Sequence, residues 1–297
     1  MAFDLGGTRL KAALVDPANA DVSGFFTAPV GSTIAEGIAE IESVGKRILD
    51  GSSCEGVGLC VPGLVDDQGI IASLPGKFEG AEGFDLPGSM RLAFDCEPVI
   101  VNDAVAFGVG ESVHGAGRGF RSVTVVTIGT GVGVTAVSDG LPIGAGLYPG
   151  GILAGHIPVS ERTSGPIDTN GTHDTIEALC RATRLVDYAN DAGGSFEDVA
   201  AVYAAHDKRD VSARAGVDRY RSLLAHSLVA IAHAFAPEAI VLGGGPMTKD
   251  NPVIQGIEET VNSRLFGSYR TRILISQLGD TAALVGLGSL WRKRFSR

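Results

Sequence analysis

The sequence predicts an α/β protein with two domains that face one cleft, and three observations support this fold class. Short apolar segments rich in β-branched residues alternate with longer segments whose apolar residues recur at helical spacing. The chain has 297 residues, a length that fits one to two domains. A pattern of strand, glycine turn and strand occurs twice, at residues 1–15 and 122–137, which predicts two similar half-sheets.

Composition narrows the class of protein further. Apolar residues make up 44% of the chain and charged residues 20%, as in a globular protein with a sizeable core. The formal net charge of −10 argues against a nucleic-acid partner. Scattered cysteines fit a reduced cytoplasmic setting, and we expect no membrane contact, because there is neither a signal peptide nor a membrane-spanning stretch. Four scattered cysteines indicate neither a disulfide framework nor a cysteine zinc site: Cys54, Cys60, Cys96 and Cys180.

The first element is a hairpin in which strands 1–5 and 9–15 are joined by Gly6-Gly7-Thr8. Its tip has almost no side chains, so backbone N–H groups and a threonine hydroxyl can hold phosphate oxygens. Asp4 interrupts the apolar run just before the tip, where its carboxylate can hold a hydrated Mg²⁺. The hairpin therefore predicts a phosphate-binding turn beside a magnesium site. The simpler alternative is a turn that uses glycine only for its positive φ.

The next segments complete a first sheet with a helix over it. Thr33 and Glu36 form a capping-box pattern before apolar residues at helical spacing, so we expect a helix over residues 34–48. Residues 73–87, rich in glycine and proline, are predicted to be a loop along a cleft wall. Further strands are predicted at residues 22–30, 56–65 and 70–72.

Residues 99–111 contain the strongest candidate for a catalytic group. An apolar run typical of a buried strand ends at Asn102-Asp103, and small residues typical of a closely packed helix follow at once. Asp103 then faces open backbone N–H groups and the positive end of a helix dipole, which favour the ionised carboxylate. An ionised carboxylate beside a cleft can act as a base. The alternative is that Asp103 is only the N-cap of the helix.

The second hairpin repeats the features of the first. Strands 122–128 and 134–137 flank Gly129-Thr130-Gly131-Val132-Gly133, and the repetition makes phosphate-binding tips a stronger inference than either hairpin alone. His156 follows a glycine-rich segment, and a lone histidine is by itself more typical of a structural residue than of a ligand.

The C-terminal part of the chain alternates helices and strands. A buried strand at residues 239–242 ends in Gly243-Gly244-Gly245, a tight turn that lets backbone approach a flat ring such as adenine. The alternative is a plain turn between a strand and a helix. Other predicted elements are helices at 176–190, with Glu177 near its start, at 219–236, and at 282–290, where Gly286 and Gly288 allow close packing, and a strand at 272–276.

Five motifs in order resemble one known family, the ROK sugar kinases, within the actin/hexokinase-like (ribonuclease H-like) ATPase fold. Asn102-Asp103-Ala104 is similar to the family's catalytic motif, and Gly58 to Asp66 is similar to its strand ending in Pro-Gly-x-Val-Asp. The three glycine turns resemble its two phosphate loops and its adenosine loop: Asp4-Leu5-Gly6-Gly7-Thr8, Gly129-Thr130-Gly131-Val132-Gly133 and Gly243-Gly244-Gly245.

The resemblance implies a glucokinase-like, ATP-dependent carbohydrate kinase. Such an enzyme transfers the γ-phosphate of ATP to a hydroxyl of a hexose, amino-sugar derivative or sugar-like polyol, with Asp103 as general base and Asp4 holding Mg²⁺ through water. The acceptor residues it implies are Gly63, Ser73, Asn102, Asp103, His156 and Glu177. The ATP residues it implies are Gly6, Gly7, Thr8, Lys11, Gly129, Thr130, Gly131, Gly243, Gly244 and Gly245.

The resemblance also implies how the chain is organised. We expect a small N-terminal domain over residues 1–104, onto which the C-terminal helix at about 282–297 packs back, and a larger domain over residues 105–281. A kinase of this size is expected to be a homodimer. The alternative function is a catalytically silent sugar-binding or regulatory homologue. A DNA-binding repressor is discounted because this chain begins at the first strand, without a helix-turn-helix segment.

Departures from the family pattern concern the acceptor side. Leu153 stands where the family usually has Glu, Ser73 where Asn is common, and Val105 where Asn is usual. The family usually continues with a cysteine-rich zinc stretch, but residues 164–177 contain no cysteine, so we predict no structural zinc. The alternative is a site in which His173 and Asp174 join His156. Without zinc, His156 is free to hydrogen-bond the acceptor.

Overall fold

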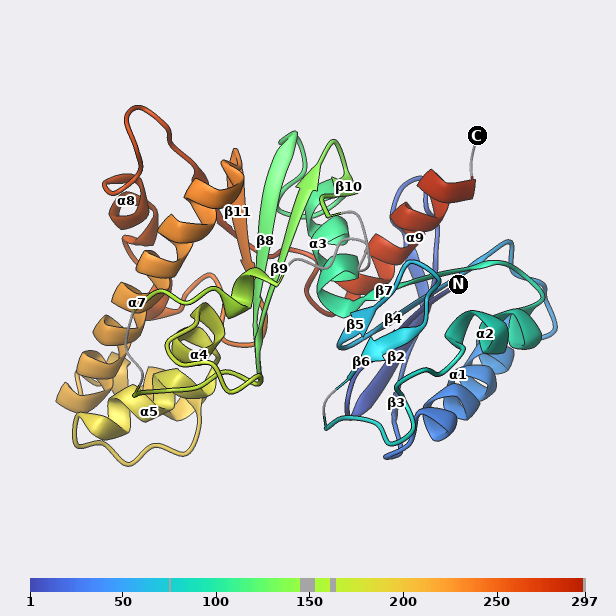
Figure 1. The fold of residues 1–297 in the computed structure, drawn as a ribbon, viewed down its shortest axis with the longest axis horizontal. Coiled ribbons are helices and arrows are strands. Elements are labelled where there is room, and N and C mark those ends of the chain that lie inside the picture. The colour runs from blue at the N-terminus through green and yellow to red at the C-terminus, as the bar shows by residue number, and fades with distance from the viewer. Residues whose placement is uncertain (75, 145–152, 161–163, 296–297) are drawn as a thin grey trace. The chain divides into compact units, whose positions relative to one another are not determined.

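The structure is a computed structural model that describes residues 1–74, 76–144, 153–160 and 164–295 (Figure 1). The chain divides into two compact units, and each is described by itself. The first comprises Met1–Gly119, Thr135–Gly151 and Gln277–Arg297, and the second comprises Phe120–Val134 and Ile152–Ser276.

A five-stranded sheet in the order β3-β2-β1-β4-β7 forms the centre of the first unit. Strands β1 to β3 are antiparallel, whereas β1, β4 and β7 run parallel to one another. A short pair, β5 and β6, stands apart from this sheet. The strands are β1 (Ala2–Leu5), β2 (Arg9–Val15), β3 (Val22–Pro29), β4 (Val57–Val61), β5 (Leu64–Val65), β6 (Ile71–Ser73) and β7 (Pro98–Asn102).

Helices cover both faces of this sheet (Figure 1). Because side chains alternate along a strand, Phe3 and Leu5 pack with α1 and α2, whereas Ala2 packs with α3 and α9. Asp4 alternates with Phe3 and Leu5, so it belongs to the α3 and α9 face. The helices are α1 (Ile34–Leu49), α2 (Leu86–Phe94), α3 (Asp103–Val113) and α9 (Ala282–Phe295).

Two predictions for this unit need correction. Residues 56–65 are not one strand, because Pro62-Gly63 separates β4 from β5 and Gly63 has a φ of +84°. The predicted loop over 73–87 extends two residues into α2, whose N-cap Asp85 accepts a hydrogen bond from Gly88 N. The predicted capping box at Thr33 and Glu36 is present at the start of α1.

Helices α3 and α9 pack closely because glycines stand at their contact. A Cβ on Gly286 would overlap the carbonyl oxygen of Ala106, and one on Gly110 would overlap that of Ala282. The fully buried Glu111 ties α3 to the segment before α9, since its carboxylate accepts hydrogen bonds from Gln277 N and Leu278 N. The position of α3, and of Asp103 at its start, thus depends on α9.

The second sheet repeats the order of the first. It runs β10-β9-β8-β11-β12. Three strands that are consecutive in sequence are followed by two strands that run parallel to β8, as in the order β3-β2-β1-β4-β7 of the first sheet. The two similar half-sheets predicted from the repeated hairpin are therefore present. The strands are β8 (Ser122–Ile128), β9 (Val132–Ser138), β10 (Leu141–Pro142), β11 (Ala239–Gly243) and β12 (Arg272–Ile275).

The helices of the second unit differ from prediction in several bounds. The helix expected over 176–190 is two helices, because Arg181 has extended backbone between them. The helix expected over 219–236 begins earlier, at Val211, after Asp210 caps it by accepting from Ala213 N. The helices are α4 (Ile176–Cys180), α5 (Thr183–Asp191), α6 (Val199–Asp207), α7 (Val211–Phe235) and α8 (Ile257–Asn262), of which α6 and α8 were not predicted.

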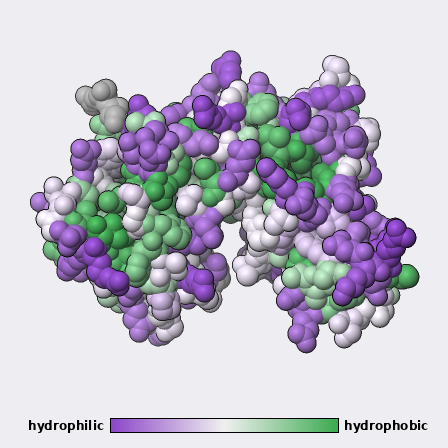
Figure 2. Space-filling model, turned by 180° about the vertical axis from the view of Figure 1, so that it is seen from behind, coloured by the Kyte–Doolittle hydropathy of each residue, from purple (hydrophilic) through white to green (hydrophobic). Residues whose placement is uncertain are grey.

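Hydrophilic and hydrophobic residues lie side by side on the face shown in Figure 2. Large exposed apolar side chains belong to separate elements, such as Leu92 in α2 and Val211 at the start of α7. Of the helices in the described part of the chain, none is long and apolar enough to cross a membrane.

Candidate functional site

The predicted site residues fall into two groups, one in each unit. In the first unit, the β1–β4 register places Asp4 opposite Cys60, and the β1–β2 register places it opposite Lys11. The Cys60 thiol donates a hydrogen bond to Asp4 Oδ1 at 3.5 Å, and Lys11 Nζ lies 3.9 Å from Asp4 Oδ2. Burial raises the pKa of Asp4, and the charge of Lys11 opposes this effect.

Asp103 is the first residue of α3, and the N-cap is its neighbour Asn102. The Asn102 Oδ1 accepts hydrogen bonds from Ala104 N and Val105 N, while its Nδ2 donates to the Gly63 carbonyl at 2.7 Å. The alternative reading of Asp103 as only an N-cap is therefore wrong, because Asn102 fills that role. Both ends of the Asn102 amide are engaged with backbone, and its contact with an acceptor stays a prediction.

The expected ionisation of Asp103 needs correction. Its pKa is raised to about 6, first by burial of the carboxyl group and second by the charge of Asp4, against the opposing charge of Lys77. The hydrogen bond from Ala104 N to Asp103 Oδ1, at 2.8 Å, lowers the pKa but does not outweigh burial. The Asp103 carboxylate therefore takes up a proton near pH 6.

Three charged or polar neighbours in this group were missed at the sequence level. Lys77 has a charge that acts on both Asp4 and Asp103. Asp280, just before α9, accepts a hydrogen bond from Lys11 Nζ at 2.8 Å, which lowers the pKa of Asp280. Cys60 is the third. No sequence pattern marks Lys77, and Asp280 lies 269 residues from Lys11.

The first hairpin tip has the predicted length, but the second is shorter than predicted because β9 begins at Val132 and not at Val134. Neither tip uses glycine for positive φ. None of Gly6, Gly7, Gly129 and Gly131 has positive φ, so the simpler alternative does not explain them. A Cβ on Gly129 would meet no protein atom within 4 Å, and one on Gly7 would meet only the flexible Lys77 side chain at 3.3 Å. Gly129 and Gly7 thus present backbone that no rigid protein group covers.

Glu177 lies against the second tip. It is 5% exposed, and its Oε2 accepts a hydrogen bond from Val132 N at 3.2 Å, while a Cβ on Gly131 would lie 2.7 Å from the same oxygen. The Oε1 accepts from Thr169 N at 2.9 Å and from Thr169 Oγ1 at 2.8 Å. Gly131 is therefore required to let Glu177 approach the tip.

His156 is held by a buried carboxylate. Its Nδ1 lies 2.8 Å from Asp168 Oδ2, and Asp168 is 4% exposed. Burial alone would raise the pKa of Asp168, but hydrogen bonds from His156, Thr175 and nearby backbone lower it below its ordinary value. Asp168, Thr169 and Thr175 were not predicted as site residues, because residues 160–175 read only as a polar, turn-rich segment.

The zinc alternative does not fit these contacts. His173 Nδ1 lies 3.0 Å from the Gly165 carbonyl, and Asp174 Oδ2 accepts from Ser160 Oγ, so neither is drawn to His156. Within the described ranges, no group of three or more His, Cys, Asp or Glu side chains is arranged to hold a metal ion. The absence of structural zinc itself stays a prediction.

The glycines after β11 lie beside the second tip. Gly244 has a φ of +99°, and a Cβ there would overlap the carbonyl oxygen of Ile128, the last residue of β8. Gly245 has no protein atom within 4 Å of a Cβ. The β8–β11 register, which pairs Gly243 with Thr127, brings this turn next to the hairpin.

The remaining acceptor positions and the departures from the family pattern lie in different environments. Ser73 ends β6, and a Cβ on Gly63, the residue before β5, would overlap the Ser73 carbonyl oxygen, so Gly63 lies close to the end of β6. Val105 is 1% exposed and belongs to the core of α3, whereas Leu153 is 51% exposed. An apolar Val105 is therefore explained by packing.

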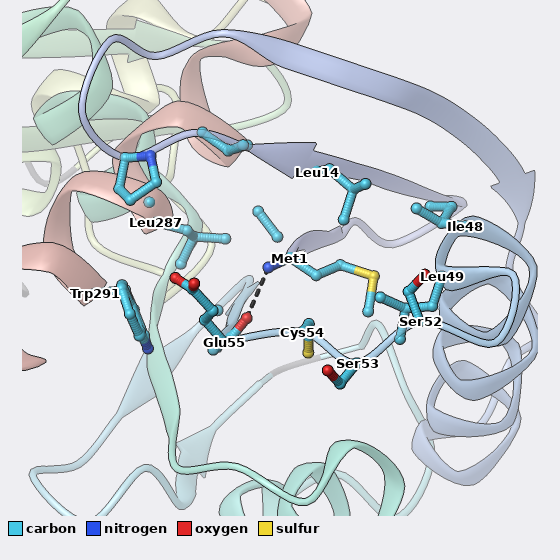
Figure 3. A pocket seen from close by; sticks show the side chains of 16 residues that line it. Met1, Leu14, Ile48, Leu49, Ser52, Ser53, Cys54, Glu55, Leu287 and Trp291 are labelled. Atoms are coloured by element: carbon cyan, nitrogen blue, oxygen red, sulfur yellow. Dashed lines mark hydrogen bonds between the residues drawn. The ribbon is translucent and has the colours of Figure 1, made fainter.

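A separate pocket of about 310 Å³ lies in the first unit, at the amino ends of β1 and β4 (Figure 3). Figure 3 shows Leu287 and Trp291 of α9 on one side and Ile48 and Leu49 of α1 on the other. Asp4 and Asp103 lie toward the opposite, carboxyl ends of the parallel strands. This pocket is therefore not part of the candidate site.

Two sheets of repeated order, each with a glycine-tipped hairpin, define a class: the protein has the two-domain actin/hexokinase-like α/β fold. The ROK family model matches residues 1–294, and the chain belongs to this family. The resemblance inferred from the five motifs is thus confirmed.

Relatives in the family include kinases and repressors. A glucokinase of Thermotoga maritima is 26% identical over 99% of this chain and 97% of its own length. The xylose repressor of Bacillus subtilis is 25% identical over 79% of this chain and 60% of its own length. Among solved structures, a ROK family glucokinase from Streptomyces griseus in complex with glucose and AMPPNP has a TM-score of 0.82, with 24% identity over 98% of each chain.

Proposed function

We propose that this protein is an ATP-dependent carbohydrate kinase, which transfers the γ-phosphate of ATP to a hydroxyl of a hexose, amino-sugar derivative or sugar-like polyol. The observation that carries the proposal is Asp103, a carboxylate at a helix start whose pKa is raised to about 6. A general base is most effective when its pKa lies near the working pH. The names of the relatives support this class of reaction.

In this proposal, Asp103 accepts the proton of the acceptor hydroxyl as its oxygen attacks the γ-phosphorus. The proton ends on the Asp103 carboxylate, and the bond between the γ-phosphorus and the bridging oxygen of ADP breaks. Base catalysis of this kind contributes roughly 10²–10⁴-fold. Positioning of the phosphates and neutralisation of their charge supply the rest of the rate enhancement.

We assign the nucleotide to the glycine turns and to a Mg²⁺ ion that Asp4 would hold. The hairpin tips fit phosphate oxygens because a Cβ-sized space stands free above Gly129, and next to Gly7 only the flexible Lys77 side chain would be in contact. Asp4 offers the carboxylate oxygens that Mg²⁺ prefers and would hold the ion through water, where it neutralises phosphate charge. The residues assigned to ATP are Gly6, Gly7, Thr8, Lys11, Gly129, Thr130, Gly131, Gly243, Gly244 and Gly245.

We assign the acceptor to the positions that the sequence indicated for it. His156 and Glu177 supply imidazole and carboxylate groups for sugar hydroxyls, as hydroxyls need both donors and acceptors. The other assigned residues are Gly63, Ser73, Asn102 and Asp103.

The test is an ADP-release screen of purified protein with Mg-ATP against hexoses, amino sugars, N-acetyl sugars and cyclitols. We expect turnover with at least one acceptor, and a loss of about a hundredfold or more in Asp103→Asn with ATP binding retained. Asp85→Asn is the matched control, since Asp85 also begins a helix of the first unit but is exposed and caps α2. Its turnover should equal that of the wild type.

Two outcomes would overturn the proposal. Turnover of Asp103→Asn equal to the wild type would remove Asp103 from the chemistry. Sugar binding by calorimetry without ADP release for any acceptor would instead favour the silent sugar-binding or regulatory homologue.

A further inference from the structure

Residues 167–173 form a small turn closed by an antiparallel bridge between Ile167 and His173. Within it, Asp168 Oδ1 accepts hydrogen bonds from Asn170 N at 2.9 Å and Thr172 N at 2.8 Å. Its Oδ2 accepts hydrogen bonds from Thr175 Oγ1 at 3.1 Å and from His156 Nδ1 at 2.8 Å. A carboxylate has about four lone-pair sites, so all of them are used by these groups.

We propose that Asp168 stands in for the family's structural metal and positions His156 toward the acceptor. The proposal rests on the proposed function, in which His156 contacts an acceptor hydroxyl. A structural zinc holds a segment through four ligands, usually thiolates and histidine. Here one buried carboxylate gathers four donors in the stretch where the family's cysteines are missing. Asp168 is thus a positioning residue and does not touch the reacting atoms.

The contact fixes which imidazole nitrogen carries the proton. Because a carboxylate only accepts hydrogen bonds, the Nδ1 of His156 must carry the proton, and in the neutral ring Nε2 is then a free acceptor. The His156 side chain is 33% exposed, so Nε2 can meet a ligand hydroxyl. Hydrogen-bond partners of this kind orient metal-ligating imidazoles, and their mutation typically lowers metal affinity or activity by about 10–100-fold.

The same turn holds the other predicted acceptor residue. Thr169, next to Asp168, donates its N–H and its hydroxyl to Glu177 Oε1, and Glu177 Oε2 accepts from Val132 N at the second tip. Thr175, which donates to Asp168, also caps α4, the helix that carries Glu177. One turn therefore orders both His156 and Glu177.

The chain contains a matched turn that lacks the histidine. Asp66 Oδ1 accepts hydrogen bonds from Gln68 N at 2.9 Å and Ile70 N at 2.8 Å, with the same spacing as at Asp168. Asp66→Asn therefore measures the cost of changing such a turn without changing an imidazole partner.

The first measurement needs no variant of Asp168. In protein labelled with ¹⁵N at histidine, with His156→Gln used for assignment, the neutral His156 should be protonated at Nδ1. A ring protonated at Nε2 would overturn the proposal. So would about one zinc per chain by elemental analysis of untagged protein, lost together with activity on chelation.

The second measurement is a double-mutant cycle on the acceptor found in the kinase screen. Asp168→Asn should raise the acceptor KM by at least about tenfold, with the ATP KM within about twofold, whereas Asp66→Asn should change neither. In the His156→Gln background, the effect of Asp168→Asn should fall below about twofold. An undiminished effect there, or equal effects of Asp66→Asn and Asp168→Asn, would make Asp168 merely structural.

The two hypotheses fail in different ways. If no acceptor is phosphorylated, the proposed function fails, while the ¹⁵N signal of His156 and sugar binding by calorimetry still decide the role of Asp168.

Discussion

Asp4 and Asp103 stand on either side of the buried Cys60, and the charge of Asp4 helps to raise the pKa of Asp103 to about 6. The sheet explains why they are neighbours. Asp4 pairs with Cys60 across β1 and β4, Cys60 pairs with Val101 across β4 and β7, and Asp103 follows two residues later. The same two carboxylates raise the pKa of the Cys60 thiol, after burial.

The first prediction is a pH dependence set by Asp103. Because a base must be ionised, kcat/KM should fall as the pH drops through about 6, and at pH 5 it should be about tenfold below its plateau. The measurement is a steady-state profile between pH 5 and 8. His156→Gln should keep this inflection although its rate is lower, which separates Asp103 from the imidazole. A flat profile over this range would contradict the assignment.

The second prediction concerns the stability cost of the same carboxylate. The pKa of Asp103 is raised above its ordinary value of 3.8, so the folded protein bears an unfavourable ionised group above pH 6 and loses that cost as the pH falls. Asp103→Asn should therefore be more stable than the wild type at pH 7.5, by roughly 1–3 kcal/mol. The gain should shrink on acidification from pH 6 toward 4.

Urea unfolding at several pH values checks this sign. Asp85→Asn, at the exposed start of α2, should show no such pH-dependent gain. If Asp103→Asn were less stable than the wild type at pH 7.5, the ionised carboxylate would stabilise the folded protein, which contradicts the prediction.

Local patterns in the sequence were sufficient to predict the two hairpins and the position of Asp4 in the first of them. Glycine and threonine between alternating strands mark a tip, and a lone aspartate in an apolar run marks a polar group near the end of a buried strand. The capping box at Thr33 and the small residues of α9 were also sufficient, since each depends on residues a few positions apart.

Tertiary neighbours could not be found in this way. The helix dipole suggested an ionised Asp103, but burial, which depends on packing of α3 against the sheet, decides its pKa. Asp168 looked like an ordinary turn residue because His156 lies 12 positions away. The start of α7 was missed because serine, glycine and valine in its first two turns are weak helix formers, although Asp210 offered a cap.

The third prediction separates two glycines of one tip. Gly129→Ala places a methyl group in open space, so stability should change by no more than about 0.5 kcal/mol. If phosphate oxygens approach this tip, the affinity for ATP measured by calorimetry should fall about tenfold or more, with acceptor affinity unchanged. Unchanged nucleotide affinity would mean that the tip is structural only.

Gly131→Ala should behave differently, because its Cβ would lie 2.7 Å from Glu177 Oε2. Displacing this buried carboxylate from Val132 N should cost roughly 1–3 kcal/mol of stability and weaken acceptor binding as well.

The last prediction tests the packing that holds Asp103 in place. A helical Gly→Ala change usually stabilises a protein by about 1 kcal/mol, but a Cβ on Gly286 of α9 would overlap the Ala106 carbonyl oxygen of α3. Backbone cannot yield as a flexible side chain can, so Gly286→Ala should destabilise by roughly 1–3 kcal/mol and lower kcat, since α3 begins at Asp103. Gly37→Ala in α1 is the control, because its Cβ would meet only the Leu5 methyls, at 3.3 Å, and the Val30 side chain at 3.5 Å. Urea midpoints and initial rates measure both effects, and a stabilised Gly286→Ala would show that α3 and α9 are free to separate.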